Sequence, residues 1–193
     1  MNQDARIAGA PVSWGVIEIP DWGYQMPADR VLREAASLGL AAVEAGPEDL
    51  LPRDPAEVSK VLAKYELSLV GGFVPAVLHE PDLRERELAL VERRAKFFGA
   101  AGADVLVLAA ITSTRPFEQT AELDDAAWRA LSESLSAVEE ICARYEVTPA
   151  LHHHFGTVIE RDEHLRRFLE GCEMGLCPGA AIPWRSRSLR GAG

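Results

Sequence analysis

Three adjacent histidines, His152, His153 and His154, are the residues whose types and spacing point most directly to chemistry. They follow a short apolar run, and Glu160 lies six residues after His154. Imidazole nitrogens and carboxylate oxygens are donors that divalent metal ions accept. On an extended segment, side chains two residues apart point to the same side, so His152 and His154 can share one ion while His153 faces away. The segment therefore predicts a metal site with His152, His154 and Glu160 as candidate ligands.

Each of these assignments has a structural alternative. The histidines can instead form a surface cluster or belong to the core and a turn. Glu160 precedes a helical pattern, where the helix dipole favours a carboxylate without any metal. His164, on that helix, is expected to face solvent.

Other residues with chemical potential also follow apolar runs. Glu44 is a candidate general base or hydroxyl-binding group, with a buried structural role as the alternative. His79 is a candidate acid or substrate ligand, or an ordinary loop histidine. Trp14 can stack on the ring of a polyol or belong to the core, and Thr112 is a candidate substrate-binding residue.

The elements that must position these residues alternate between apolar strands and amphipathic helices. Continuous apolar runs are typical of parallel strands covered by helices. The expected strands are Arg6–Trp14 (running into a loop), Leu40–Glu44, Leu67–Phe73, Val105–Ala110, Val147–His152 and Met174–Cys177. One expected helix starts at Pro27, and a second has Asp54 as N-cap, starts at Pro55 and reaches about Tyr65. The other expected helices span Leu83–Ala101, Asp124–Tyr145 and Asp162–Leu169.

Two α/β folds fit this alternation: an open doubly wound sheet and a (β/α)8 TIM barrel. No Gly-x-Gly-x-x-Gly motif follows the first strand, which weakens the dinucleotide-binding version of the first fold. The candidate site residues follow several different strands, and a barrel places its site at that end of every strand. The sequence therefore favours a TIM barrel, here about five βα units plus the sixth strand.

Composition limits the class of protein and its partners. The chain has 193 residues and a net charge of −10, which suits one domain and argues against a nucleic-acid partner. No apolar run approaches the roughly 20 residues that span a membrane. Three cysteines in no paired spacing are compatible with a reducing cytoplasm. The expected partner is a small polyol or ketose substrate, and a homo-oligomer is compatible with this interpretation.

Residues 178–193 break the alternating pattern. They contain three arginines and no Asp or Glu, and they show neither a strand period nor a helix period. We therefore expect residues 1–177 to form a partial barrel. Residues 178–193 are expected to be a basic tail that is either disordered or the product of a shifted reading frame.

Four segments occur in an order that is typical of one family. They are Gly9–Val16 (Gly-Ala-Pro-Val-Ser-Trp-Gly-Val), Val43–Pro47, Val70–Pro75 leading to His79, and His152–Glu160 with a His-x-His-x-Gly-Thr-x-x-Glu pattern. Together they resemble the xylose isomerase-like sugar isomerase/epimerase TIM barrels, and within these the inosose dehydratases. The resemblance covers residues 1 to about 177.

The sequence departs from that family after the sixth strand. Gly175, Leu176 and Cys177 match, but Pro178 and Gly179 stand where the family continues Leu-Asp-Thr-Gly-His with an expected metal-binding Asp. Ligands expected from later strands have no counterpart. Related epimerases also have a strand-end Glu where this chain has His152.

The resemblance implies the dehydration of scyllo-inosose in inositol catabolism, with Mn²⁺ or Co²⁺ as cofactor. In that reaction the ion stabilises an enediolate while a base removes a proton and the β-hydroxyl leaves. Two alternatives remain open: a ketose isomerase or epimerase on the same barrel, and an inactive barrel fragment. We expect this chain to have low or no dehydratase activity.

Overall fold

The computed structural model of the chain describes residues 7–17, 23–112, 122–171 and 175–176. Within these ranges, six parallel strands form one sheet in the order β1-β2-β3-β4-β5-β6. The strands are β1 (Ala8–Gly9), β2 (Ala42–Glu44), β3 (Ser68–Ala76), β4 (Val105–Ala110), β5 (Thr148–Leu151) and β6 (Gly175–Leu176). The helices are α1 (Ala28–Ser37), α2 (Pro55–Ala63), α3 (Arg84–Ala100), α4 (Asp125–Arg144) and α5 (Asp162–Gly171), with short 3-10 helices η1 (Pro11–Trp14) and η2 (Pro81–Leu83).

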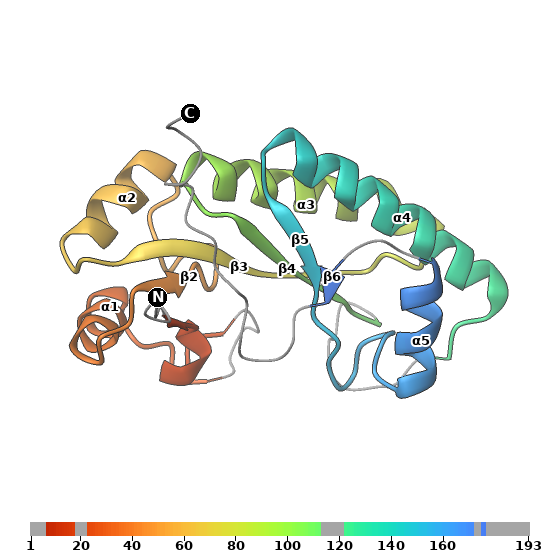
Figure 1. The fold of residues 1–193 in the computed structure, drawn as a ribbon, viewed down its shortest axis with the longest axis horizontal. Coiled ribbons are helices and arrows are strands. Elements are labelled where there is room, and N and C mark those ends of the chain that lie inside the picture. The colour runs from red at the N-terminus through yellow and green to blue at the C-terminus, as the bar shows by residue number, and fades with distance from the viewer. Residues whose placement is uncertain (1–6, 18–22, 113–121, 172–174, 177–193) are drawn as a thin grey trace, which may run out of the picture.

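The strand order confirms the barrel prediction. Each strand pairs with the strand before it in the chain, whereas the strand order of a doubly wound sheet reverses at a switch point. The helices lie in an arc around the sheet, with α1 and α5 toward its two ends (Figure 1). The described strands number six, and a closed TIM barrel has eight.

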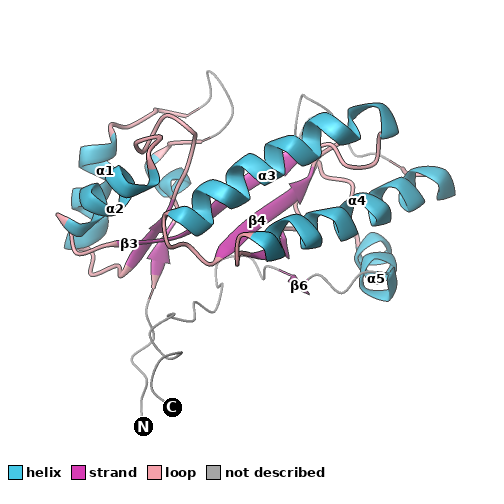
Figure 2. Ribbon diagram, turned by 90° about the horizontal axis from the view of Figure 1, so that it is seen from above, coloured by secondary structure: helices cyan, strands magenta, loops and turns pink. Residues whose placement is uncertain are grey.

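Successive residues of β4 point to opposite faces of the sheet. One set packs beneath the helices in the main core cluster: Leu106, Leu108 and Ala110. The other set packs on what we call the inner face, defined by four residues: Phe73, Val105, Val107 and Ala150. Figure 2 shows α3 and α4 running along the outside of the sheet over β4. The strand β4 is therefore buried on both faces, as its continuous apolar run predicts.

Two adjacent glycines set the geometry of the middle of the sheet. A Cβ atom at Gly71 would lie 2.0 Å from the carbonyl oxygen of Val105, and one at Gly72 would lie 2.8 Å from the ring of Phe98 on α3. The pairing of β2 with β3 shifts at this point, so that Glu44 is opposite Gly71. The missing side chains therefore let β3 approach β4 on one side and α3 on the other.

Most predicted elements are confirmed within a few residues, and three of the differences affect segments that carry candidate site residues. Arg6 and the expected tail 178–193 lie outside the described residues. Within those residues, the expected strand Arg6–Trp14 is a strand only at Ala8–Gly9, because Pro11 begins η1. β3 continues past Phe73 to Ala76. β5 ends at Leu151, which places His152 in the loop that follows. No helix within the described ranges is long and apolar enough to span a bilayer.

The close approach at Gly71 generates a stability prediction. Gly71→Ala should lower the free energy of unfolding by about 2 kcal/mol or more, because the added carbon must displace backbone of β4. Gly171→Ala is the matched control, since nothing lies within 4 Å of a Cβ atom there. Urea unfolding of the three proteins checks the prediction, and equal midpoints for Gly71→Ala and wild type would contradict it.

Candidate metal centre

Backbone hydrogen bonds from β4 hold the loop that carries the histidines. The His152 N–H donates to Leu108 O at 2.8 Å, and the Val158 N–H donates to Ala110 O at 2.9 Å. An isolated antiparallel bridge joins Ile111 to Thr157. The loop is thus fixed at both ends to the carboxyl end of β4, where a barrel places its site.

The rings of His152 and His154 lie on the same side of this loop. Their centroids are 5.5 Å apart, and their planes are inclined at 32°. His152 is half-buried, and its ring is nearly perpendicular to that of Phe73 on the inner face. The centroids of these two rings are 5.9 Å apart. The spacing of two residues therefore places the imidazoles side by side, as the sequence indicates, although His154, like His153, is exposed.

The surroundings of His152 favour its neutral form. Burial lowers the pKa of His152 below its ordinary value of 6.5, and the neighbouring His154 and His153 lower it further. A neutral imidazole has a free nitrogen lone pair, which is the form that binds metals. His152 therefore has the protonation state that a ligand needs near neutral pH.

Glu160 makes a contact that the sequence does not predict. One oxygen of its carboxylate accepts a hydrogen bond from the Gly156 N–H at 3.0 Å. Among the residues that the structure describes, no group of three or more His, Cys, Asp and Glu side chains is gathered closely enough to hold a metal. The described residues thus offer two imidazole donors, and the role of Glu160 as third ligand stays a prediction.

The expectation that His164 faces solvent is wrong. Its side chain is buried, and the centroid of its ring lies 6.1 Å from that of Trp128 on α4. Its Nδ1 accepts from the backbone N–H groups of Glu160 and Arg161, each at 3.5 Å. Burial lowers the pKa of His164, and Arg161 adds to the effect. His164 therefore lies near the start of α5 and packs this helix against α4.

Glu44 ends β2 and is half-buried. Val43 packs with the helices in the main core, so alternation along the strand turns Glu44 toward the inner face. Two arginines of α3 hold the loop that follows: Arg94 donates to Gly46 O at 3.4 Å, and Arg93 pairs with Glu48 at 3.0 Å. The general-base role of Glu44 remains a prediction.

His79 and Thr112 follow adjacent strands, β3 and β4. Both are buried, and His79 Nδ1 and Thr112 Oγ1 have no hydrogen-bond partner. Burial lowers the pKa of His79, an effect that Glu80 partly opposes with its oxygen 3.7 Å from His79 Nε2. Buried polar atoms without partners are costly in the folded state, so they mark places where a ligand or water can bind.

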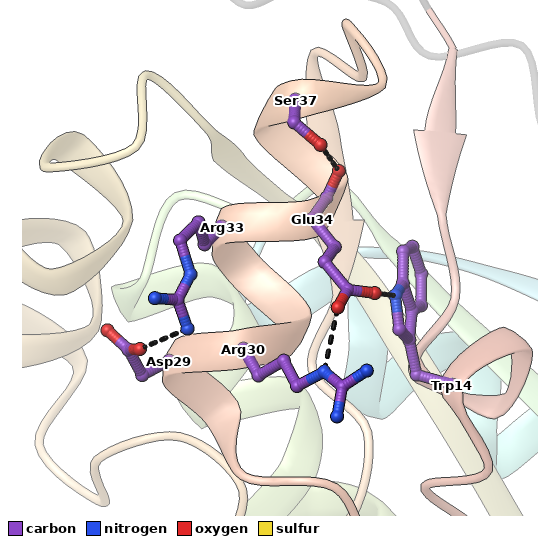
Figure 3. Close-up of polar contacts among 6 residues, drawn as sticks. All are labelled: Trp14, Asp29, Arg30, Arg33, Glu34 and Ser37. Atoms are coloured by element: carbon purple, nitrogen blue, oxygen red, sulfur yellow. Dashed lines mark hydrogen bonds and ion pairs between the residues drawn. The ribbon is translucent and has the colours of Figure 1, made fainter.

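Trp14 is held from the side by α1. Its indole N–H donates to Glu34 at 2.9 Å, and Glu34 also pairs with Arg30 at 2.7 Å (Figure 3). The hydrogen bonds from Arg30 and Trp14 lower the pKa of the Glu34 carboxyl. The Trp14 ring is partly buried and packs against the core, which agrees in part with the alternative that it is a core residue. Its stacking on a substrate stays a prediction.

The structure brings His152 and His154 together and adds residues that the sequence does not single out. Phe73 packs on His152, and Glu34 fixes Trp14. The alternation of side chains along β3 is a signal that could have placed Phe73 on the inner face, because Val74 and Ala76 pack on the opposite face. No local pattern marks Glu34, which lies 20 residues from Trp14 in the chain.

Comparisons with known proteins place this geometry in a family. The sequence profile of the xylose isomerase-like TIM barrel matches residues 32–178. The chain is 29% identical over 173 residues to the inosose dehydratase of Geobacillus kaustophilus, covering 86% of this chain and 56% of that enzyme. The chain thus spans little more than half the length of the curated relatives it matches.

Solved structures show the same fold. A xylose isomerase-like TIM barrel protein from Mycobacterium smegmatis in complex with magnesium has a TM-score of 0.66 and 20% identity, covering 91% of this chain and 64% of that one. L-ribulose 3-epimerase also has a TM-score of 0.66, at 15% identity, with 86% of this chain and 57% of that one covered. Because the family profile matches well over half of its residues, the chain belongs to the xylose isomerase-like TIM barrel family.

Proposed function

We propose that this chain carries a metal-dependent site for the dehydration of a keto-inositol such as scyllo-inosose. The observation that carries the proposal is the pair of imidazoles, His152 and His154, side by side at the carboxyl end of β5. The similarity to inosose dehydratases supplies the reaction class, a hydro-lyase of inositol catabolism.

The two histidines would hold a divalent ion, with water and substrate completing its coordination. When bound, such an ion acts as a Lewis acid toward the substrate carbonyl and acidifies the neighbouring carbon. A mixed set of imidazole and oxygen donors is compatible with Mn²⁺ and Co²⁺, the two ions that we propose. The similar Mycobacterium smegmatis protein was solved with magnesium, which is a third ion to test.

The proton transfers are assigned to two residues at neighbouring strand ends. Glu44, turned toward the inner face, would remove the proton from the carbon beside the carbonyl. His79, whose pKa is lowered by burial, would donate a hydrogen bond from a ring N–H to the departing β-hydroxyl, and the proton that Glu44 removes would leave with that hydroxyl as water. The unpartnered hydroxyl of Thr112 would bind a substrate hydroxyl, and the Trp14 ring would lie against the substrate ring.

Product analysis tests the proposed reaction. The chain is incubated with Mn²⁺ and either scyllo-inosose or a ketohexose, and products are followed by NMR. We expect slow formation of the dehydrated dione from scyllo-inosose, because two histidines alone make a weak metal site. An epimerised ketohexose without any dione would instead support the epimerase alternative, which shares the fold.

Substitution of the histidines tests the metal assignment. His152→Ala and His154→Ala should each weaken Mn²⁺ binding by more than about tenfold, since each removes one nitrogen donor. His153→Ala is the matched control, because this residue lies between the other two in the chain and its exposed side chain is not a proposed ligand. Calorimetric titration of the metal-free proteins measures the effect, and equal losses in all three variants would refute this assignment.

The low pKa of His79 predicts how stability depends on pH. The unfolded chain takes up a proton near pH 6.5, but the folded chain resists it, so folded-state stability should fall as the pH drops below about 6.5. His79→Gln removes this contribution and should flatten the dependence between pH 7.5 and 5.5. Urea unfolding in metal-free buffer at several pH values measures it. The exposed His153→Gln is the control, and an unchanged slope in His79→Gln would contradict the prediction.

A further inference from the structure

The hydroxyl of Thr157 lies at the centre of the histidine loop. Thr157 is 1% exposed, and its Oγ1 lies 2.7 Å from His154 O and 3.1 Å from Ile159 O. The same oxygen accepts a hydrogen bond from the His154 N–H at 3.4 Å. One buried hydroxyl therefore binds both backbone groups of His154 and ties that residue to the end of the loop.

A tight turn connects His154 to Thr157. The Thr157 N–H donates to His154 O at 3.1 Å, and Gly156 has a φ of 73°, which suits the third position of a type II turn. The N–H of Gly156 points out of this turn and donates to Glu160 at 3.0 Å. The carboxylate thus binds the turn at Gly156, whereas the Thr157 hydroxyl contacts His154 and Ile159.

We propose that Thr157 and Glu160 are positioning residues that hold His154 beside His152, with Glu160 acting through the Gly156 N–H and not as a metal ligand. This inference rests on the proposed function. A metal-binding pair of imidazoles needs both rings fixed. His154 is exposed and its Nδ1 lies 2.6 Å from Phe155 O, while its backbone groups bind the Thr157 hydroxyl within the turn that Glu160 contacts. Groups that orient a ligand in this way commonly change metal affinity when they are removed.

Conservative variants separate positioning from ligation. Glu160→Gln keeps an oxygen that can accept from Gly156 but removes the negative charge, whereas Glu160→Ala removes both. Thr157→Ser keeps the hydroxyl, and Thr157→Val removes it at nearly constant volume. Glu163→Gln and Thr148→Val, both on exposed residues, are the matched controls.

Two measurements are made on each folded variant. Hydrogen exchange of the Gly156 amide in metal-free protein reports the turn, and calorimetric titration reports Mn²⁺ affinity. We expect Glu160→Ala and Thr157→Val to speed the exchange and to weaken Mn²⁺ binding by about 10- to 100-fold. Glu160→Gln and Thr157→Ser should remain within about threefold of wild type in both.

One result overturns the proposal directly. If Glu160→Gln loses as much Mn²⁺ affinity as Glu160→Ala while the Gly156 amide stays protected, Glu160 binds the metal itself. Unchanged exchange and affinity in Thr157→Val would equally refute the role of the hydroxyl. If the wild-type chain binds no Mn²⁺, the proposed function fails, and the exchange rates still decide whether these two residues hold the turn.

Discussion

The backbone pairing of β4 is the constraint on which the candidate site depends. Every residue of β4 is buried, and its carbonyl groups accept from the first and last parts of the histidine loop. The Ile111 N–H donates in turn to Ala76 O at the end of β3, three residues before His79. Two of the candidate functional segments are therefore fixed by peptide groups, whose bonding does not depend on which side chains the loops carry.

Some buried polar side chains near the candidate site destabilise the folded state. Among the described residues, three buried side-chain atoms lack hydrogen-bond partners: His79 Nδ1, Arg84 Nε and Thr112 Oγ1. A buried polar atom without a partner typically costs about 1–3 kcal/mol. Two of the three lie at the ends of β3 and β4, where the candidate substrate would bind. A ligand hydroxyl there would recover part of that cost.

Local periodicity accounts for the parts of the structure that the sequence predicts well. Val105–Ala110 is apolar throughout and is β4, and the two-residue spacing of His152 and His154 puts their rings on one side. The prediction fails where a contact joins distant segments. His164 is buried because Trp128 covers it from α4, 36 residues earlier, and no pattern within α5 reveals that neighbour.

Glu160 illustrates a different limit. A carboxylate at this spacing is equally compatible with a metal ligand and with a helix-start residue, and the structure shows a third use, as acceptor for the Gly156 N–H. The distinction depends on the direction of one peptide N–H within a turn. That direction follows from the positive φ of Gly156. The sequence shows only that a glycine stands in a loop at this position and does not reveal the angle.

The sequential strand order has a consequence for how the molecule reaches this arrangement. Because each strand pairs with the one before it, the sheet can grow in the direction of synthesis, one βα unit at a time. The contacts of Trp14 with α1 involve only the first unit, so they can form early. The histidine loop needs β4 already in place. The chemistry-bearing loop would thus acquire its shape after β1 to β4, on strands that are by then already paired beneath it.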